Sequence, residues 1–102
     1  MVKIFWFAVP PKSMDNGTDL ESLIIVHPMP IILKCPVYAD PPPEIHWFKN
    51  GDALEMEENV HLKGQELRIR KSNGDYSGNY SCLAQNPAGN FTKLFMVKVI
   101  GK

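Results

Sequence analysis

The feature that most constrains this chain is a spaced pattern near its C-terminal end. It reads D-x-x-G-x-Y-x-C-x-A-x-N-x-x-G, and its members are Asp75, Gly78, Tyr80, Cys82, Ala84, Asn86 and Gly89. Side chains of a β-strand alternate between two faces, so Tyr80, Cys82 and Ala84 share one face. Gly78 permits a tight bend before that strand, and the Asn-Pro-Ala-Gly run behind it is typical of a turn. The pattern predicts a strand over residues 78–85.

Two upstream residues, Cys35 and Trp47, complete the pattern. Cysteine, then tryptophan, then a second cysteine behind the tyrosine motif resembles the immunoglobulin domain, in particular its intermediate type, the I-set. The resemblance covers about residues 9–101. It implies an all-β fold, a two-sheet immunoglobulin-like Greek-key sandwich.

The resemblance also implies roles for single residues. Cys35 and Cys82 would form a disulfide across the core with Trp47 packed against it, and the Tyr80 hydroxyl would bond back to loop backbone. The Asp75 carboxylate would accept hydrogen bonds from a neighbouring loop or an arginine. A disulfide that closes so long a loop contributes roughly 4 kcal/mol in the chain-entropy picture. The alternative is a pair of buried free thiols, as in sarcomeric immunoglobulin domains.

Length and composition fit one domain. The 102 residues suffice for a single two-layer core. The formal net charge is +0, so net charge offers no argument for nucleic acid or a membrane surface as a partner. No apolar run is long enough to span a bilayer. The 2 cysteines rule out a zinc site made of cysteines alone, and the 9 prolines favour short strands over helices.

The N-terminal residues are interpreted as lying outside the domain. The opening M-V-K-I is similar to M-V-K-V at 96–99, which would end an immunoglobulin domain. We therefore expect residues 1–9 to be the tail of a preceding module or a linker, and residues 10–102 to be the I-set domain. A short signal peptide is the alternative, although Pro10-Pro11 replaces the small-residue cleavage site.

Period-two alternation and turn residues divide the domain into strands. A loop or ragged first strand at 12–19 is followed by expected strands at 20–26, 31–38, 44–49, 53–56, 59–62, 65–70, 78–85 and 91–100. The inward positions of two of these strands are Ile31, Leu33, Cys35, Val37, Phe95, Val97 and Val99. The chain has no room for the additional strand of a variable-type domain, which favours the I-set.

The sequence does not favour catalysis. The histidines His27, His46 and His61 lie far apart and lack metal-ligand spacing. Ser81 is expected to face solvent from a flat sheet, whereas active sites are clefts in which several groups converge. We predict no enzymatic activity, no metal site and no cofactor.

Two surface clusters are candidate binding sites. Phe48, Leu83, Leu94 and Met96 point away from the core on neighbouring strands, and contiguous apolar patches often mark protein partners. The alternative is ordinary scattered apolar exposure.

The second cluster is basic and consists of Lys34, Arg68 and Arg70 on the other sheet, which would suit a sulfated glycan. The alternative is a solvated polar face, since residues 55–58 are acidic and the chain is neutral.

Three N-glycosylation sequons begin at Asn16, Asn79 and Asn90 and agree with an extracellular location. The runs P-P-P-E-I-H-W-F-K-N-G and C-L-A-Q-N-P-A-G resemble the repeated I-set modules of hemicentin-like adhesion and matrix proteins. That resemblance implies a secreted or cell-surface spacer module that binds proteins, including a second copy or neighbouring immunoglobulin modules. A ligand-binding domain of a receptor tyrosine kinase and an intracellular titin-like mechanical module stay open as alternatives.

Overall fold

Ten β-strands and one 3₁₀ turn make up the part of the chain that the computed structural model describes, residues 7–15 and 19–101. In chain order they are β1 (Val9–Ser13), β2 (Leu20–Val26), β3 (Ile31–Lys34), β4 (Val37–Asp40), β5 (Glu44–Lys49), β6 (Asp52–Ala53), β7 (Val60–Lys63), β8 (Glu66–Ile69), η1 (Gly74–Tyr76), β9 (Gly78–Asn86) and β10 (Gly89–Ile100).

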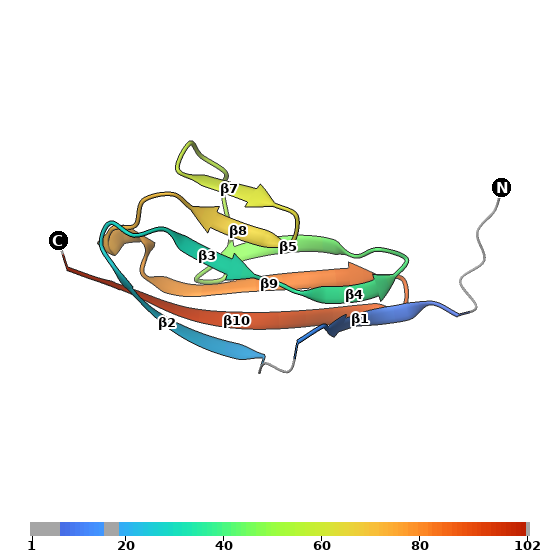
Figure 1. The fold of residues 1–102 in the computed structure, drawn as a ribbon. Helices are drawn as coiled ribbons and strands as arrows, with labels where there is room; N and C mark the ends of the chain where they lie inside the picture. Colours follow the sequence, from blue (N-terminus) through green and yellow to red (C-terminus); the bar gives the residue numbers. More distant parts are fainter. Residues whose placement is uncertain (1–6, 16–18, 102) are drawn as a thin grey trace.

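The strands lie in two layers (Figure 1). One layer is a five-stranded sheet in the order β2-β10-β9-β5-β6. The other consists of the three-stranded sheet β3-β8-β7 and the pair β1-β4. Strand β2 runs parallel to β10, and the other pairs are antiparallel. The predicted all-β sandwich is confirmed.

The core lies between the two layers and follows the predicted alternation. Its buried hydrophobic members are Ile31, Leu33, Cys35, Val37, Ala39, Trp47, Val60, Leu67, Ile69, Tyr80, Cys82, Ala84, Phe95 and Val97. Val99, predicted to face inward, is partly buried against this cluster. The inward positions are apolar along both sheets because burial of apolar area is the main favourable term in folding.

The disulfide crosses the core between the layers. Cys35 and Cys82 are bonded, with their Cα atoms 6.3 Å apart, so the alternative of free thiols does not hold. Trp47 lies opposite Cys82 on the neighbouring strand, and its ring centroid is 5.7 Å from that of Phe95. The predicted roles of both cysteines and of Trp47 as a core residue are confirmed.

Tyr80 behaves as predicted, and Gly78, the first residue of β9, permits a close approach to Asn50. The Tyr80 hydroxyl donates to the carbonyl of Tyr76 at 2.6 Å while its ring is buried. Gly78 has φ 157°, and a Cβ there would lie 3.0 Å from Oδ1 of Asn50. Only glycine allows this close approach, which lets that oxygen accept from the backbone N–H of Asn79 at 2.9 Å.

The expected role of the Asp75 carboxylate is wrong. Asp75 lies exposed in η1, where its backbone N–H donates to Oδ1 of Asn73 at 2.8 Å and its carbonyl accepts from Nζ of Lys49. Among the described residues, no arginine forms an ion pair with its carboxylate. The backbone of Asp75, rather than its side chain, fixes the turn.

Several strand boundaries also differ from the expected ones. The strand expected over 31–38 is split into β3 and β4 because Pro36 has no N–H for the ladder. The carbonyl of Pro36 accepts instead from the N–H of Met14 at 2.8 Å. Strand β6 is shorter than the segment expected at 53–56.

The first strand begins earlier than expected. Strand β1 starts at Val9, the last residue of the predicted tail or linker, and Val9 pairs with Asp40. The Asn86 amide donates to the carbonyls of Val9 at 2.8 Å and Pro41 at 3.1 Å. The pattern residue Asn86 thus ties β1 and the loop before β5 to the β9–β10 turn. Residues 1–6 lie outside the described residues, so their assignment to the tail of a preceding module or a linker stays a prediction.

Candidate protein-binding face

The five-stranded sheet presents one apolar side to solvent, which we call the outer face. Its apolar members are Leu20, Ile24, Val26, Phe48, Leu83, Leu94, Met96 and Ile100. They belong to β2, β5, β9 and β10, which lie side by side in the sheet (Figure 1). The opposite side of the same strands packs on the core, as period-two alternation requires.

The sheet register brings the four predicted interface residues together. Leu94 and Phe48 both lie opposite Ser81, one from each neighbouring strand, so they stand in one row. Leu94 is 49% exposed and Met96 is 50% exposed, whereas Phe48 and Leu83 are partly buried. Two of the four residues therefore expose about half of their surface to a partner.

The outer face continues onto β2, which the sequence did not indicate. Leu20 lies opposite Leu94, Ile24 opposite Lys98 and Val26 opposite Ile100. Ile24 is 70% exposed. The run L-E-S-L-I-I-V is apolar at adjacent positions, so alternation does not say which side faces out. Only the pairing with β10, distant in sequence, sets that side.

The outer face carries little charge. Along β2, β5, β9 and β10, two charged residues alternate onto this side. Glu44 lies opposite Gln85, and Lys98 lies between Met96 and Ile100 on β10. Glu21 and Lys93 lie on the same strands but alternate to the inner side. A side with several exposed apolar residues and few charges suits a protein surface better than an ionic ligand.

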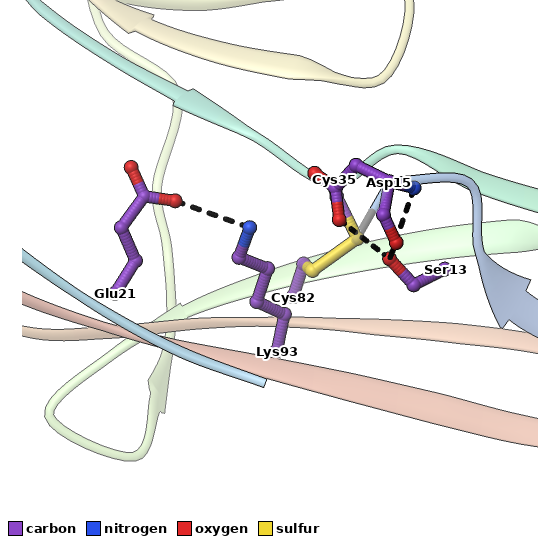
Figure 2. A network of polar contacts seen from close by, with 6 residues as sticks. All are labelled: Ser13, Asp15, Glu21, Cys35, Cys82 and Lys93. Atoms are coloured by element: carbon purple, nitrogen blue, oxygen red, sulfur yellow. Dashed lines mark hydrogen bonds and ion pairs between the residues drawn. A yellow bond between two sulfur atoms is a disulfide. The ribbon is translucent and has the colours of Figure 1, made fainter. Parts of the chain in front are cut away.

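An ion pair fastens β2 to the inner side of the sheet (Figure 2). Nζ of Lys93 lies 3.1 Å from a carboxylate oxygen of Glu21, and the Lys93 side chain is only 5% exposed. The ammonium also lies 5.3 Å from the Phe95 ring centroid. Lys93 lies opposite Cys82 on β9, so this buried cation is next to the disulfide. Burial of this side chain could not be predicted from the sequence, because lysine is rarely buried.

One carboxylate, that of Glu66, lies within the predicted basic cluster. Glu66 lies 3.8 Å from Nζ of Lys34 and 2.8 Å from the Arg68 guanidinium. The hydrogen bond from Arg68 lowers the pKa of the Glu66 carboxyl, although partial burial opposes this. Arg70 lies in a different hollow, beside Glu58. The glycan-binding role of Lys34, Arg68 and Arg70 stays a prediction, and their surroundings do not strengthen it.

Two of the three sequons lie on the same side of the sheet as the outer face. Asn79 is exposed opposite Met96, and Asn90 is exposed opposite Gln85 near the β9–β10 turn. Asn16 lies outside the described residues. Whether any sequon carries sugar stays a prediction.

The described residues show no catalytic arrangement. They contain no group of three or more histidine, cysteine, aspartate or glutamate side chains placed to hold a metal. Nδ1 of His27 bonds with the carbonyl of Ser72 at 2.8 Å, and His46 lies exposed opposite Leu83. In the same residues, no helix has the length and hydropathy of a membrane span.

Fold, disulfide and tyrosine motif together define a class of protein: the chain belongs to the immunoglobulin I-set domain family, whose sequence model matches residues 18–99. The most similar relatives include mouse and human hemicentin-1. The mouse protein is 38% identical over 88 residues, which is 84% of this chain and 2% of the relative. The human protein is also 38% identical, over 95 residues. The chain thus spans a small fraction of these relatives.

Solved structures agree on the fold. The N-terminal four immunoglobulin domains of Dscam1 isoform 4.44 match with a TM-score of 0.85 at 23% identity, over 92% of this chain and 25% of that one. A chimeric titin Z1Z2 matches with a TM-score of 0.80 at 22% identity, over 94% of this chain and 50% of that one. At these identities the likeness concerns the fold alone.

Proposed function

We propose that this chain is a non-enzymatic, extracellular spacer module of an adhesion or matrix protein, and that its outer face binds another protein. The observation that carries the proposal is the outer face itself. A side of the sheet with several exposed apolar residues and only two charged ones, on a disulfide-linked domain, is typical of a contact surface. The partner that fits it is a similarly flat apolar sheet of another immunoglobulin-like module.

The disulfide supports the extracellular location. Disulfides persist in oxidising compartments and are rare in the cytosol, and Cys35 is bonded to Cys82. The same bond argues against the intracellular mechanical alternative. The similarity to hemicentin-1 supports an adhesion or matrix setting over a receptor kinase.

The shape supports the spacer role. The part of the chain that the structure describes measures 54 × 28 × 20 Å. Strand β1 begins at one end of its long axis and β10 finishes at the opposite end (Figure 1). Modules that are entered at one end and left at the other can be joined in series, which leaves the outer face accessible along the side.

Sedimentation of the chain lacking sugar tests the binding face, with a second copy of the chain as the probe partner. The double variant L83E/M96K places charge on the outer face at two strands. We expect it to reduce self-association at least about tenfold, since burial of an unpaired charge in an interface is strongly unfavourable. The melting temperature should change little, because both positions lie outside the core.

The matched control is I32E/Y38K. Ile32 is 41% exposed and Tyr38 is 48% exposed, and both lie on the opposite layer. The control introduces the same charges and should leave association unchanged. Equal association of L83E/M96K and the unaltered chain would overturn the proposed face, and equal weakening by both double variants would mean that the effect is not specific to it.

A further inference from the structure

The sequon at Asn79 opens directly onto the outer face. Asn79 and Ser81 both alternate outward on β9, whereas Tyr80 between them is buried. The backbone at Asn79 is held by Asn50, whose side chain accepts from the Asn79 N–H at 2.9 Å and whose own N–H donates to the Asn79 carbonyl at 2.7 Å. The Asn79 side chain makes no hydrogen bond within the described residues. The Asn79 backbone is therefore held in place, whereas its side-chain amide is available for a sugar.

A hollow lies next to this amide. It has a volume of about 260 Å³ and is lined by Ser22, Leu23, Ile24, Gly78, Asn79, Met96, Val97 and Lys98. Met96 lies opposite Asn79 on β10 and opposite Ser22 on β2, so the hollow spans three strands. The residue that would carry the sugar therefore forms part of the wall.

The chemistry of the wall suits the first sugar of an N-linked glycan. N-acetylglucosamine has an apolar ring face and an acetyl methyl group, and Met96 offers a flexible, polarizable surface for both. Ile24 extends that surface, being 70% exposed. Lys98 has no carboxylate partner among the described residues, and its ammonium can donate to sugar hydroxyls or the acetyl carbonyl.

Asn90 provides a contrast on the same side of the same sheet. It begins a sequon on β10, opposite Gln85. Six residues separate it from Met96, or about 20 Å along an extended strand. The hollow beside Asn79 does not include Asn90 in its wall. The first sugar of a glycan on Asn90 would leave Met96 uncovered.

We propose that an N-linked glycan on Asn79 packs its first sugar over Met96 and Ile24 and so closes this part of the outer face to proteins. The closing effect rests on the proposed function, whereas the packing of the sugar does not. Occupancy of one sequon then decides which copies of the module have an open binding face.

The test uses the chain secreted from a eukaryotic cell, together with N79Q, S81A and N90Q. Both N79Q and S81A abolish the first sequon, and S81A keeps Asn79, so a folding defect in either does not end the test. Enzymatic release of the glycan, which converts the carrier asparagine to aspartate, shows by peptide mass whether Asn79 was occupied. Mild peroxide treatment then reports the accessibility of each methionine.

We expect Met96 to oxidise at least about threefold more slowly in the glycosylated chain than in N79Q or S81A. Met56, which is 49% exposed and lies away from β10, should oxidise equally in all variants. In N90Q, which keeps the Asn79 glycan, Met96 should oxidise as slowly as in the unaltered glycosylated chain. An unoccupied Asn79, or equal Met96 oxidation with and without its glycan, would overturn the proposal.

Sedimentation separates this proposal from the proposed function. Self-association should rise in N79Q and S81A relative to the glycosylated chain, but not in N90Q. Protection of Met96 without any association in N79Q would support the sugar packing and overturn the protein-binding face. Equal association with and without the Asn79 glycan would overturn the closing effect.

Discussion

Tyr80 combines a buried ring with a hydroxyl that donates to the carbonyl of Tyr76 at 2.6 Å. Burial raises the pKa of Tyr80 to about 12, with a smaller contribution from the neighbouring Tyr76. An unfolded chain loses this proton near its ordinary value of 10.0, before the folded chain does. The stability that depends on the protonated hydroxyl is therefore complete below that value and declines as the pH rises toward 12.

Tyr80→Phe should reveal this dependence. At about pH 8 we expect it to lower the free energy of unfolding by about 1–2 kcal/mol, the net value of a buried hydrogen bond. By about pH 11 the difference in unfolding free energy between the variant and the unaltered chain should shrink by about 1 kcal/mol. The reason is that only the unaltered chain has a tyrosine that ionises more easily when the chain is unfolded. Urea titrations at both pH values measure it. Tyr38→Phe, at an exposed position, is the control, and a deficit that is independent of pH would contradict the pKa shift.

Ser72 presents the opposite case of a buried hydroxyl. It is 1% exposed, and its Oγ has no hydrogen-bond partner among the described residues. Ser72→Ala should leave the free energy of unfolding unchanged or raise it by up to about 1 kcal/mol, since it removes an unsatisfied polar group.

Ser77→Ala is the matched comparison for Ser72→Ala. Oγ of Ser77 accepts from the N–H of Val99 at 2.8 Å, so this variant should cost about 1 kcal/mol. Chemical denaturation of the two variants side by side gives the answer. A larger loss in Ser72→Ala than in Ser77→Ala would show that the Ser72 hydroxyl has a partner after all.

At the scale of elements, the Glu21–Lys93 ion pair joins the inner side of β2 to β10. The ammonium of Lys93 is nearly enclosed, whereas the Glu21 carboxylate is 48% exposed. Glu21→Gln should lower the free energy of unfolding by about 1–2 kcal/mol, less than for a fully buried pair, because solvent screens the open carboxylate. Amide exchange should accelerate in β2 and stay unchanged in β8.

A double-mutant cycle separates pairing from packing at this site. Lys93→Met replaces the cation with an apolar side chain of similar length and should cost little. In the K93M background, Glu21→Gln should then have almost no effect, since no buried cation is left to lose its partner. A loss of equal size in both backgrounds would show that Glu21 stabilises β2 by another contact.

The elements also show how far the sequence alone reaches. Strands with alternating apolar residues, such as 31–34 and 66–69, could be assigned together with their inward side, because the period is local. The outer face could be assigned only in part. Ile24 and Val26 follow no alternation, and their side depends on pairing with β10, which lies far along the chain. Burial of Lys93 likewise follows from its partner on β2 and not from its residue type.

For the whole molecule, one covalent bond joins the two layers through the core. Cys35 on the three-stranded side and Cys82 in the five-stranded sheet are 47 residues apart in sequence. Without the bond, the unfolded chain regains the entropy of a loop of that length. In a domain whose total stability is of order 5–15 kcal/mol, this entropy is a substantial share.

The double variant C35A/C82A should therefore lower the free energy of unfolding by about 4 kcal/mol, provided that the effect is mainly on the unfolded chain. Urea titration of the variant, compared with the unaltered chain in a thiol reductant, separates chain entropy from packing. The reduced chain keeps both sulfur atoms, so the entropic account expects nearly the same midpoint for both samples. The slope with urea should be steeper in both than in the oxidised chain, because an uncrosslinked chain exposes more surface on unfolding. A loss below about 1 kcal/mol in both would assign the stability of the sandwich to its packed layers rather than to the crosslink.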